Sequence, residues 1–312
     1  MAISKRAVVL LKVGVSLALV ALIAANVSAS DFVAILRSVK LPALGAALLA
    51  VALTPVVASL RWHHGCRAFN ITLPRAFLAR ATYSALFVGQ FLPAGIGVDS
   101  ARLGLLWKAG TPVPAGLGSI ACDRLAGIAA ILALAVAGLP FAPVAIPPLA
   151  LWAGAALALG ASAAAWVVSG MAQRLQLDAG PPRWLAQLAR VVVAARRALV
   201  SPHMAAAFCW GVVIHLLSIL GLLLISRSLG YELAFLPLLS ISSIAVFASL
   251  LPISFNGWGV REGALVLGLS LLQVPRESAL LISVIYGLFL AIASLPGAIF
   301  VATSSSRPVE GG

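Results

Sequence analysis

The sequence predicts an all-α, polytopic integral membrane protein whose two halves repeat each other. Of its 312 residues, 62% are hydrophobic and only 9% are charged, whereas soluble domains average about half apolar and a quarter charged. Residues 91–104 read FLPAGIGVDSARLG and residues 250–263 read LLPISFNGWGVREG. Both contain Leu-Pro, a Gly-containing break, Gly-Val, an arginine with a carboxylate nearby, and Gly. Such breaks and charges are costly in a bilayer unless they are buried in protein or line a wet cavity, and matching interruptions in two halves indicate a transport-type site.

Long apolar segments predict the helices that cross the membrane, because about 20 apolar residues span its hydrocarbon layer. The predicted full spans are Ala7–Val27, Leu41–Leu60, Ala115–Leu139, Leu149–Ser169, Met204–Ile225 and Ser278–Val301. The first follows Lys5 and Arg6 like a signal peptide, but its apolar run is longer than a signal core. We therefore expect an uncleaved first helix.

Four shorter apolar segments flank the two repeated motifs. These are Phe77–Leu92 with Val98–Ala109, and Phe235–Leu251 with Val260–Leu272. Basic segments place residue 76 and the chain beyond residue 170 on the same side, so residues 77–109 are expected to enter the membrane and return. The prediction is about six full spans plus two oppositely oriented re-entrant helical hairpins, an inverted pseudo-repeat. A plain eight-span arrangement is the alternative, since hydropathy does not separate a tilted short span from a re-entrant helix.

Charge placement predicts orientation and partners. The net charge is +13, and the basic residues gather at the ends of apolar spans, as in the positive-inside pattern. We expect both termini in the cytoplasm and some attraction to anionic headgroups. The basic-aromatic alternation of a nucleic-acid groove does not occur, so nucleic acid is excluded as a partner. One transmembrane domain is expected over 1–312, with halves at about 1–170 and 204–302, a basic cytoplasmic connector at about 171–203 and a tail at 303–312.

Four charged residues beside the two breaks are the predicted substrate-binding residues: Asp99, Arg102, Arg261 and Glu262. Arginine binds phosphate oxygens in bidentate fashion, and helix N-termini favour anions. The carboxylates would balance the arginines in the empty site, or bind an amine or a proton. Alternatively, Asp99 and Arg102 form a structural i,i+3 pair. Arg261 and Glu262 favour a site, because neighbours in a helix are expected to point apart.

Other residues are predicted to support this site. Asp123 and Arg124 are expected to form a structural pair. The remaining supporting positions lie at the two hairpin tips: Pro93, Gly97, Pro252, Asn256, Gly257 and Gly259. Trp107 and Trp258 are interpreted as interfacial or packing residues rather than substrate platforms. No phosphate-binding loop, metal-ligand set or nucleophile–base arrangement is apparent, so no catalytic residue, metal or cofactor is predicted.

Several motifs together resemble a known family. The stretches LPAGIGVDSARLGLLWKAG, SIACDRLAG, LPISFNGWGVREGALVL and the late SLPGA resemble the membrane domain of the bacterial lysylphosphatidylglycerol synthase/flippase family, also called the multiple peptide resistance factor membrane region. The resemblance runs from about Arg61 to Gly297. Val98 departs from it, since family members often carry Gly before the Asp. The soluble aminoacyl-transfer domain of the two-part enzymes has no counterpart, so synthase activity is not expected.

This resemblance implies lipid translocation, or membrane support for a lipid pathway, in the bacterial cytoplasmic membrane. Three function classes stay open. A lipid translocator fits the paired broken helices. A membrane transferase acting on a lipid-linked substrate would use Asp99, Asp123 or Glu262 as a base. A noncatalytic partner of a lipid-modifying enzyme would need these charges only for its fold.

Overall fold

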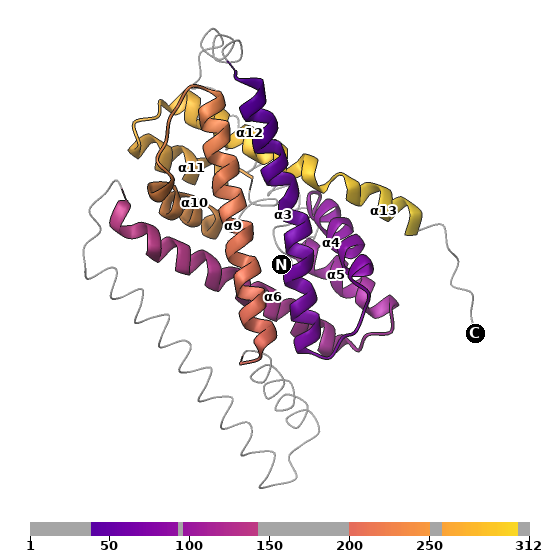
Figure 1. Cartoon of the computed structure of the whole chain (residues 1–312). Coiled ribbons are helices and arrows are strands. Elements are labelled where there is room, and N and C mark those ends of the chain that lie inside the picture. The colour runs from indigo at the N-terminus through magenta and orange to yellow at the C-terminus, as the bar shows by residue number, and fades with distance from the viewer. Residues whose placement is uncertain (1–38, 93–95, 143–199, 250–257, 305–312) are drawn as a thin grey trace, which may run out of the picture.

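All regular secondary structure in the described part of the chain is helical (Figure 1). A computed structural model describes residues 39–92, 96–142, 200–249 and 258–304. The predicted spans Ala7–Val27 and Leu149–Ser169 lie outside these ranges, as does the basic connector. So do the tip residues Pro93, Pro252, Asn256 and Gly257.

Four stretches of helix are long and apolar enough to cross a membrane: Leu41–Ala68, Val113–Phe141, Pro202–Ser228 and Arg276–Thr303. They correspond to α3 (Leu41–Ala68), α6 (Val113–Gly138) with the short 3-10 helix η1 (Leu139–Phe141), α9 (Pro202–Ser228), and α12 (Arg276–Ser294) with α13 (Pro296–Ser304). Each predicted span within the described ranges is therefore found as helix. The chain is an integral membrane protein of apolar helices.

Two boundaries differ from the prediction. Helix α3 was expected to end at Leu60, before the first charge, yet it continues to Ala68. It continues because the Arg61 side chain is largely buried and paired within the protein, so this charge does not mark the end of the embedded helix. The last span is interrupted at Leu295, because Pro296 lacks the N–H that would extend the hydrogen-bond ladder of α12.

The four remaining helices are short and form two antiparallel pairs. They are α4 (Arg75–Gly89) with α5 (Ile96–Lys108), and α10 (Phe235–Ser249) with α11 (Val260–Leu271). Leu78 near the start of α4 clusters with Leu106 near the end of α5. In the second pair, Gly268 near the end of α11 packs against the Ile241 side chain in the first half of α10. With 12 to 15 residues each, all four are shorter than the roughly 20 residues that a helical span needs.

The turns around these pairs repeat between the two halves. Residues with positive φ follow α3, α5, α9 and α11, respectively Asn70 (58°), Gly110 (80°), Gly230 (88°) and Gln273 (62°). In each turn, the residue after the positive-φ position donates its N–H to a carbonyl five residues back, as in a Schellman cap. These bonds are Ile71–Cys66 (2.9 Å), Thr111–Leu106 (3.0 Å), Tyr231–Ser226 (2.9 Å) and Val274–Leu269 (3.2 Å). The order long helix, short pair, long helix therefore occurs twice with the same turn geometry.

The first helices of the two halves, α3 and α9, lie side by side and run in opposite directions (Figure 1). At one end, the Lys40 N–H donates to the Ser228 carbonyl at 2.9 Å. At the other end, His64 Nδ1 lies 3.4 Å from His203 Nδ1. Each short pair also packs across to the opposite half, α10 against α6 and α4 against α13. The two halves are thus interlocked, with their equivalent first helices antiparallel.

Candidate functional site

Asp123 is the centre of a buried group of charges that three helices build. Its side chain is 1% exposed and accepts hydrogen bonds from arginines on two other helices. Arg61 of α3 binds it with both ends of its fork, Nε to Oδ1 at 2.7 Å and Nη2 to Oδ2 at 3.1 Å. Arg102 of α5 adds a bond from Nη1 to Oδ2 at 2.8 Å. Bidentate arginine–carboxylate pairing is the strongest common form of this interaction, and here it ties α3, α5 and α6 together.

A second pair lies beside this one and is about one-third exposed. Arg124, the residue after Asp123 in α6, donates to Asp99 in the first turn of α5 at 3.0–3.2 Å. The two side chains are 34% and 31% exposed. We call these five residues the first charge group: Arg61, Asp99, Arg102, Asp123 and Arg124. Three arginines face two aspartates, so the group carries one excess positive charge.

Arg102 is the member of this group with unused binding capacity. Its side chain is 4% exposed, and its guanidinium carbon lies 4.6 Å from the centre of the Trp62 ring. Its Nε is buried without a hydrogen-bond partner among the described residues. A buried donor left unpaired costs free energy. An additional acceptor at this nitrogen, such as a phosphate oxygen, would remove that cost.

The second charge group consists of Arg261 and Glu262 at the start of α11. Glu262 is fully buried and Arg261 is 6% exposed. Glu262 Oε2 accepts the backbone N–H of Gly259 at 2.5 Å, while its Oε1 accepts Arg261 Nε at 3.0 Å and also Arg261 Nη2. Gly259 has φ of 87°, a conformation that favours glycine.

Aromatic rings hold the Arg261 guanidinium in place. It lies 5.2 Å from the Trp258 ring centre and 5.7 Å from the Tyr286 ring centre, within cation–π range. Gly287 of α12 makes room for this stack, because a Cβ there would lie 2.6 Å from Arg261 Nη2 and 3.0 Å from the Trp258 ring. Trp258 thus packs against the charge group, whereas Trp107 is 65% exposed.

The structure brings together residues that the sequence singled out, but it pairs them differently. The sequence suggested pairing within α5 (Asp99 with Arg102) and between neighbours in α6. Instead, Asp99 pairs with Arg124, and Asp123 pairs with Arg102 and Arg61. Sequence reasoning missed Arg61 by grouping it with the basic residues at span ends. The available signal was that no proline interrupts the chain between Pro55 and Pro74, so the helix could continue past Arg61.

The expectation that Arg261 and Glu262 point apart is wrong. Both belong to the first turn of α11, where the Glu262 side chain reaches back to cap the helix start and meets the Arg261 guanidinium there. This capping also occupies the Gly259 N–H. That donor is therefore not open to a phosphate, contrary to what the prediction for the hairpin tips assumed.

One carboxylate of each charge group, Asp99 in the first and Glu262 in the second, occupies an equivalent place in its half. Helix α5 ends at Lys108 and helix α11 ends at Leu271. Asp99 and Glu262 lie at the same distance along the chain from these two helix ends. Each group is held by hydrogen bonds inside its own half, so the structure does not join Arg102 and Arg261 through a common partner among the described residues. Near the first tip, Gly97 is buried against the Leu92 side chain.

Comparison with known proteins identifies the family of this architecture. The family described as lysylphosphatidylglycerol synthase TM region matches residues 9–297, which include both charge groups and all helices up to the start of α13. A comparison with curated proteins finds no match. Because the family match covers most of the 312 residues, the chain belongs to the lysylphosphatidylglycerol synthase TM region family.

Proposed function

We propose that the protein is a lipid translocase that moves a phospholipid or lipid-linked headgroup across the cytoplasmic membrane, between its two short helix pairs. The observation that carries this proposal is the presence of a buried arginine–carboxylate pair in each of two antiparallel halves. A polar headgroup crosses hydrocarbon only if the protein supplies polar partners along its path. Equivalent sites in oppositely directed halves offer such partners to lipids from either leaflet.

The short helix pairs fit re-entrant hairpins. The first pair starts and finishes on one side of the molecule, because the start of α4 and the end of α5 both lie beside the C-terminus of α3. The second pair does the same at the C-terminus of α9, where α10 starts and α11 ends. With α3 and α9 antiparallel, the two pairs enter from opposite faces. This arrangement supports inward-pointing tips, with the α5 and α11 members of the charge groups inside the membrane.

The distribution of exposed charges supports an orientation. The end that holds the α3 C-terminus carries Arg67, Arg75 and Lys108, and no acidic residue among the described ones there. At the opposite end, three basic residues, Lys40, Arg227 and Arg276, are accompanied by two acidic ones, Glu232 and Glu277. The positive-inside pattern therefore favours the first end as cytoplasmic.

The chemistry of the first charge group suits a phosphate-bearing headgroup. Its one excess positive charge and the free Arg102 Nε provide attraction and a donor. A phosphate would compete with Asp123 for Arg102, while Arg61 continues to hold Asp123 through two bonds. Arg102 would thus exchange the Asp123 carboxylate for a phosphate oxygen, while Asp123 stays paired with Arg61. No buried charge loses its partner, so the free-energy cost of binding stays low.

The same contacts argue against a transferase that uses these carboxylates as bases. Asp99, Asp123 and Glu262 all accept hydrogen bonds from arginines. Oxygens engaged in this way are not free to take a proton from a substrate hydroxyl or amine.

The test is a lipid movement assay in liposomes that contain only this protein. Fluorescent phosphatidylglycerol in both leaflets is exposed to an impermeant quencher, and lipid extracts are analysed by mass spectrometry. We expect loss of the protected inner-leaflet signal without any new lipid product. Arg67→Gln, an exposed change outside both charge groups, serves as the matched control and should keep the full rate. A new lipid product would instead support the transferase, and neither movement nor product would support the noncatalytic partner.

A further inference from the structure

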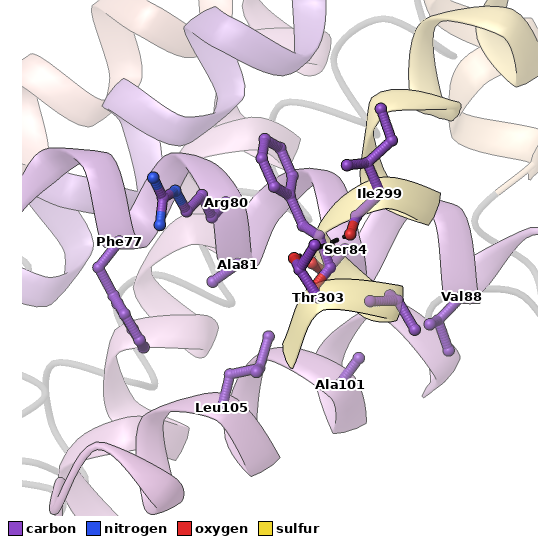
Figure 2. Close-up of a pocket in the computed structure, with 11 residues that line it drawn as sticks. Phe77, Arg80, Ala81, Ser84, Val88, Ala101, Leu105, Ile299 and Thr303 are labelled. Carbon is purple, nitrogen blue, oxygen red and sulfur yellow. Dashed lines mark hydrogen bonds between the residues drawn. The ribbon is translucent and has the colours of Figure 1, made fainter. Parts of the chain in front are cut away.

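A cavity of about 780 Å³ lies between the first short helix pair and α13, away from both charge groups (Figure 2). Its walls are mostly apolar, with Phe77 and Val88 from α4, Leu105 from α5, and Ile299 and Phe300 from α13. The volume falls in the range of small-molecule sites in proteins. A cavity of this kind in an embedded helix bundle suits an acyl chain rather than a water-soluble ligand.

Arg80 is the one charged residue among those that line the cavity. It is exposed, makes no ion pair within the described ranges, and lies with its guanidinium carbon 5.9 Å from the centre of the Phe300 ring. Ser84 and Thr303 also line the cavity (Figure 2), and the Thr303 hydroxyl donates to the carbonyls of Ile299 and Phe300 within α13. A cation at the edge of an apolar cavity matches a phosphate attached to a hydrocarbon chain.

The fold itself does not require this arginine. Arg80 in α4 and Ser240 in α10 are equivalent positions. Each lies the same number of residues after the first residue of its helix, which is Arg75 in α4 and Phe235 in α10. Ser240 is 2% exposed and neutral, so the equivalent helix of the second half packs without a charge. The charge at residue 80 therefore calls for an explanation in terms of what lies in the cavity.

The depth of Arg80 matches the headgroup region of one leaflet. At 1.5 Å per residue, Arg80 lies about 7 Å along α4 from Arg75, which belongs to the basic end of the molecule. Val88 lies further toward the inner tip of α4. A lipid with its phosphate at Arg80 would therefore extend its chain inward along α4 and α13.

The cavity is separate from the first charge group. Helix α5 presents Ala101 and Leu105 to the cavity, whereas Arg102, on its adjacent face, is hydrogen-bonded to Asp123. We propose that this cavity is a binding site for a membrane glycerophospholipid, with an acyl chain between α4, α5 and α13 and the phosphate on Arg80. The site does not depend on translocation and exists whether or not the protein moves lipid.

The experiment measures lipid contact directly. The purified protein is placed in nanodiscs with a trace of phosphatidylglycerol that carries a diazirine in its acyl chain, irradiated, and mapped by peptide mass spectrometry. We expect crosslinks on α4 and α13 around the cavity, and at least a fivefold loss of them in Arg80→Gln. Arg75→Gln, an exposed arginine of the same helix outside the cavity, should keep them. Ala101→Phe, which fills the cavity, should lose them too.

Competition on the unaltered protein gives a second measurement that does not depend on the folding of any variant. Excess unlabelled phosphatidylglycerol should remove the cavity crosslinks at least fivefold more effectively than excess diacylglycerol, which has the chains but no phosphate. Equal competition by the two lipids, or equal crosslinking in Arg80→Gln and Arg75→Gln, would show only unselective contact with surrounding lipid and would overturn the proposal. Neither result would bear on the movement assay above.

Discussion

Among single residues, Asp123 should matter most for stability, because Arg61 and Arg102 both pair with its carboxylate inside the protein. Asp123→Asn leaves Arg61 and Arg102 without a balancing charge inside the protein. Removing one partner of a buried ion pair costs about 3–5 kcal/mol, so we expect a clear drop in melting temperature and in monodisperse yield in detergent.

Asp99→Asn is the matched comparison for this substitution. It removes the same charge from the same group, but its pair with Arg124 is about one-third exposed, where such pairs contribute about 0–1 kcal/mol. Its melting temperature should stay near that of the unaltered protein. Equal loss of stability in both variants would mean that burial does not govern the strength of these pairs.

A second prediction at this level concerns Gly287, which gives space to the Arg261 stack. Gly287→Ala places a methyl group against the flexible end of Arg261 and against Trp258, so we expect normal folding but slower lipid movement. Gly263→Ala in α11 meets open space and should leave the rate unchanged. Equal rates in the two variants would mean that the position of Arg261 does not matter for movement.

The positions of the charges were predictable from the sequence, but their partners were not. Charged residues next to Gly and Pro in apolar surroundings stand out by composition alone. Pairing depends on how helices pack, and Arg61 meets Asp123 from 62 positions away along the chain. Likewise, the contact between Arg261 and Glu262 arises from the local geometry of a helix start, which the ordinary rule for helix interiors does not describe.

At the level of helices, the sequence predicted most boundaries well. Helices α6 and α9 were predicted to within a few residues, because α9 is a long apolar run and apolar residues extend on both sides of Asp123 and Arg124 in α6. Proline and glycine likewise marked the breaks that leave α4, α5, α10 and α11 short. The end of α3 was missed, because hydropathy treats Arg61 as an end whereas the fold buries it.

The disposition of the short helix pairs in the membrane gives a third prediction. Single cysteines are introduced in a background without Cys66, Cys122 and Cys209, and are labelled with an impermeant thiol reagent in sealed vesicles. Thr72 and Ala109, on either side of the first pair, should be labelled from the same face, and Ala234 and Pro275 from the opposite face. All four positions are exposed. Labelling of Thr72 and Ala109 from opposite faces would support the eight-span arrangement instead.

For the molecule as a whole, the account rests on two interlocked antiparallel halves, each carrying one buried charge group. The repeated turns, the crossed packing of each short pair on the other half, and the equivalent places of Asp99 and Glu262 all express this relation. The sequence repeat indicated it in advance. The sequence did not indicate that each group would be paired internally. In the proposed function, a headgroup would therefore have to displace a carboxylate from an arginine.

The most direct test of lipid movement through these paired sites is a double-mutant comparison of Arg102 and Arg261 in the liposome assay. Arg102→Gln leaves Asp123 bound by Arg61, so this variant should fold. If a headgroup must pass both sites, each single variant should slow movement about tenfold or more, and the double variant should be little slower than either, because residues acting as a unit are non-additive. Arg→Lys at either position should restore only part of the rate, since it keeps the charge without the planar fork. A double variant that moves lipid at the unaltered rate would contradict the account.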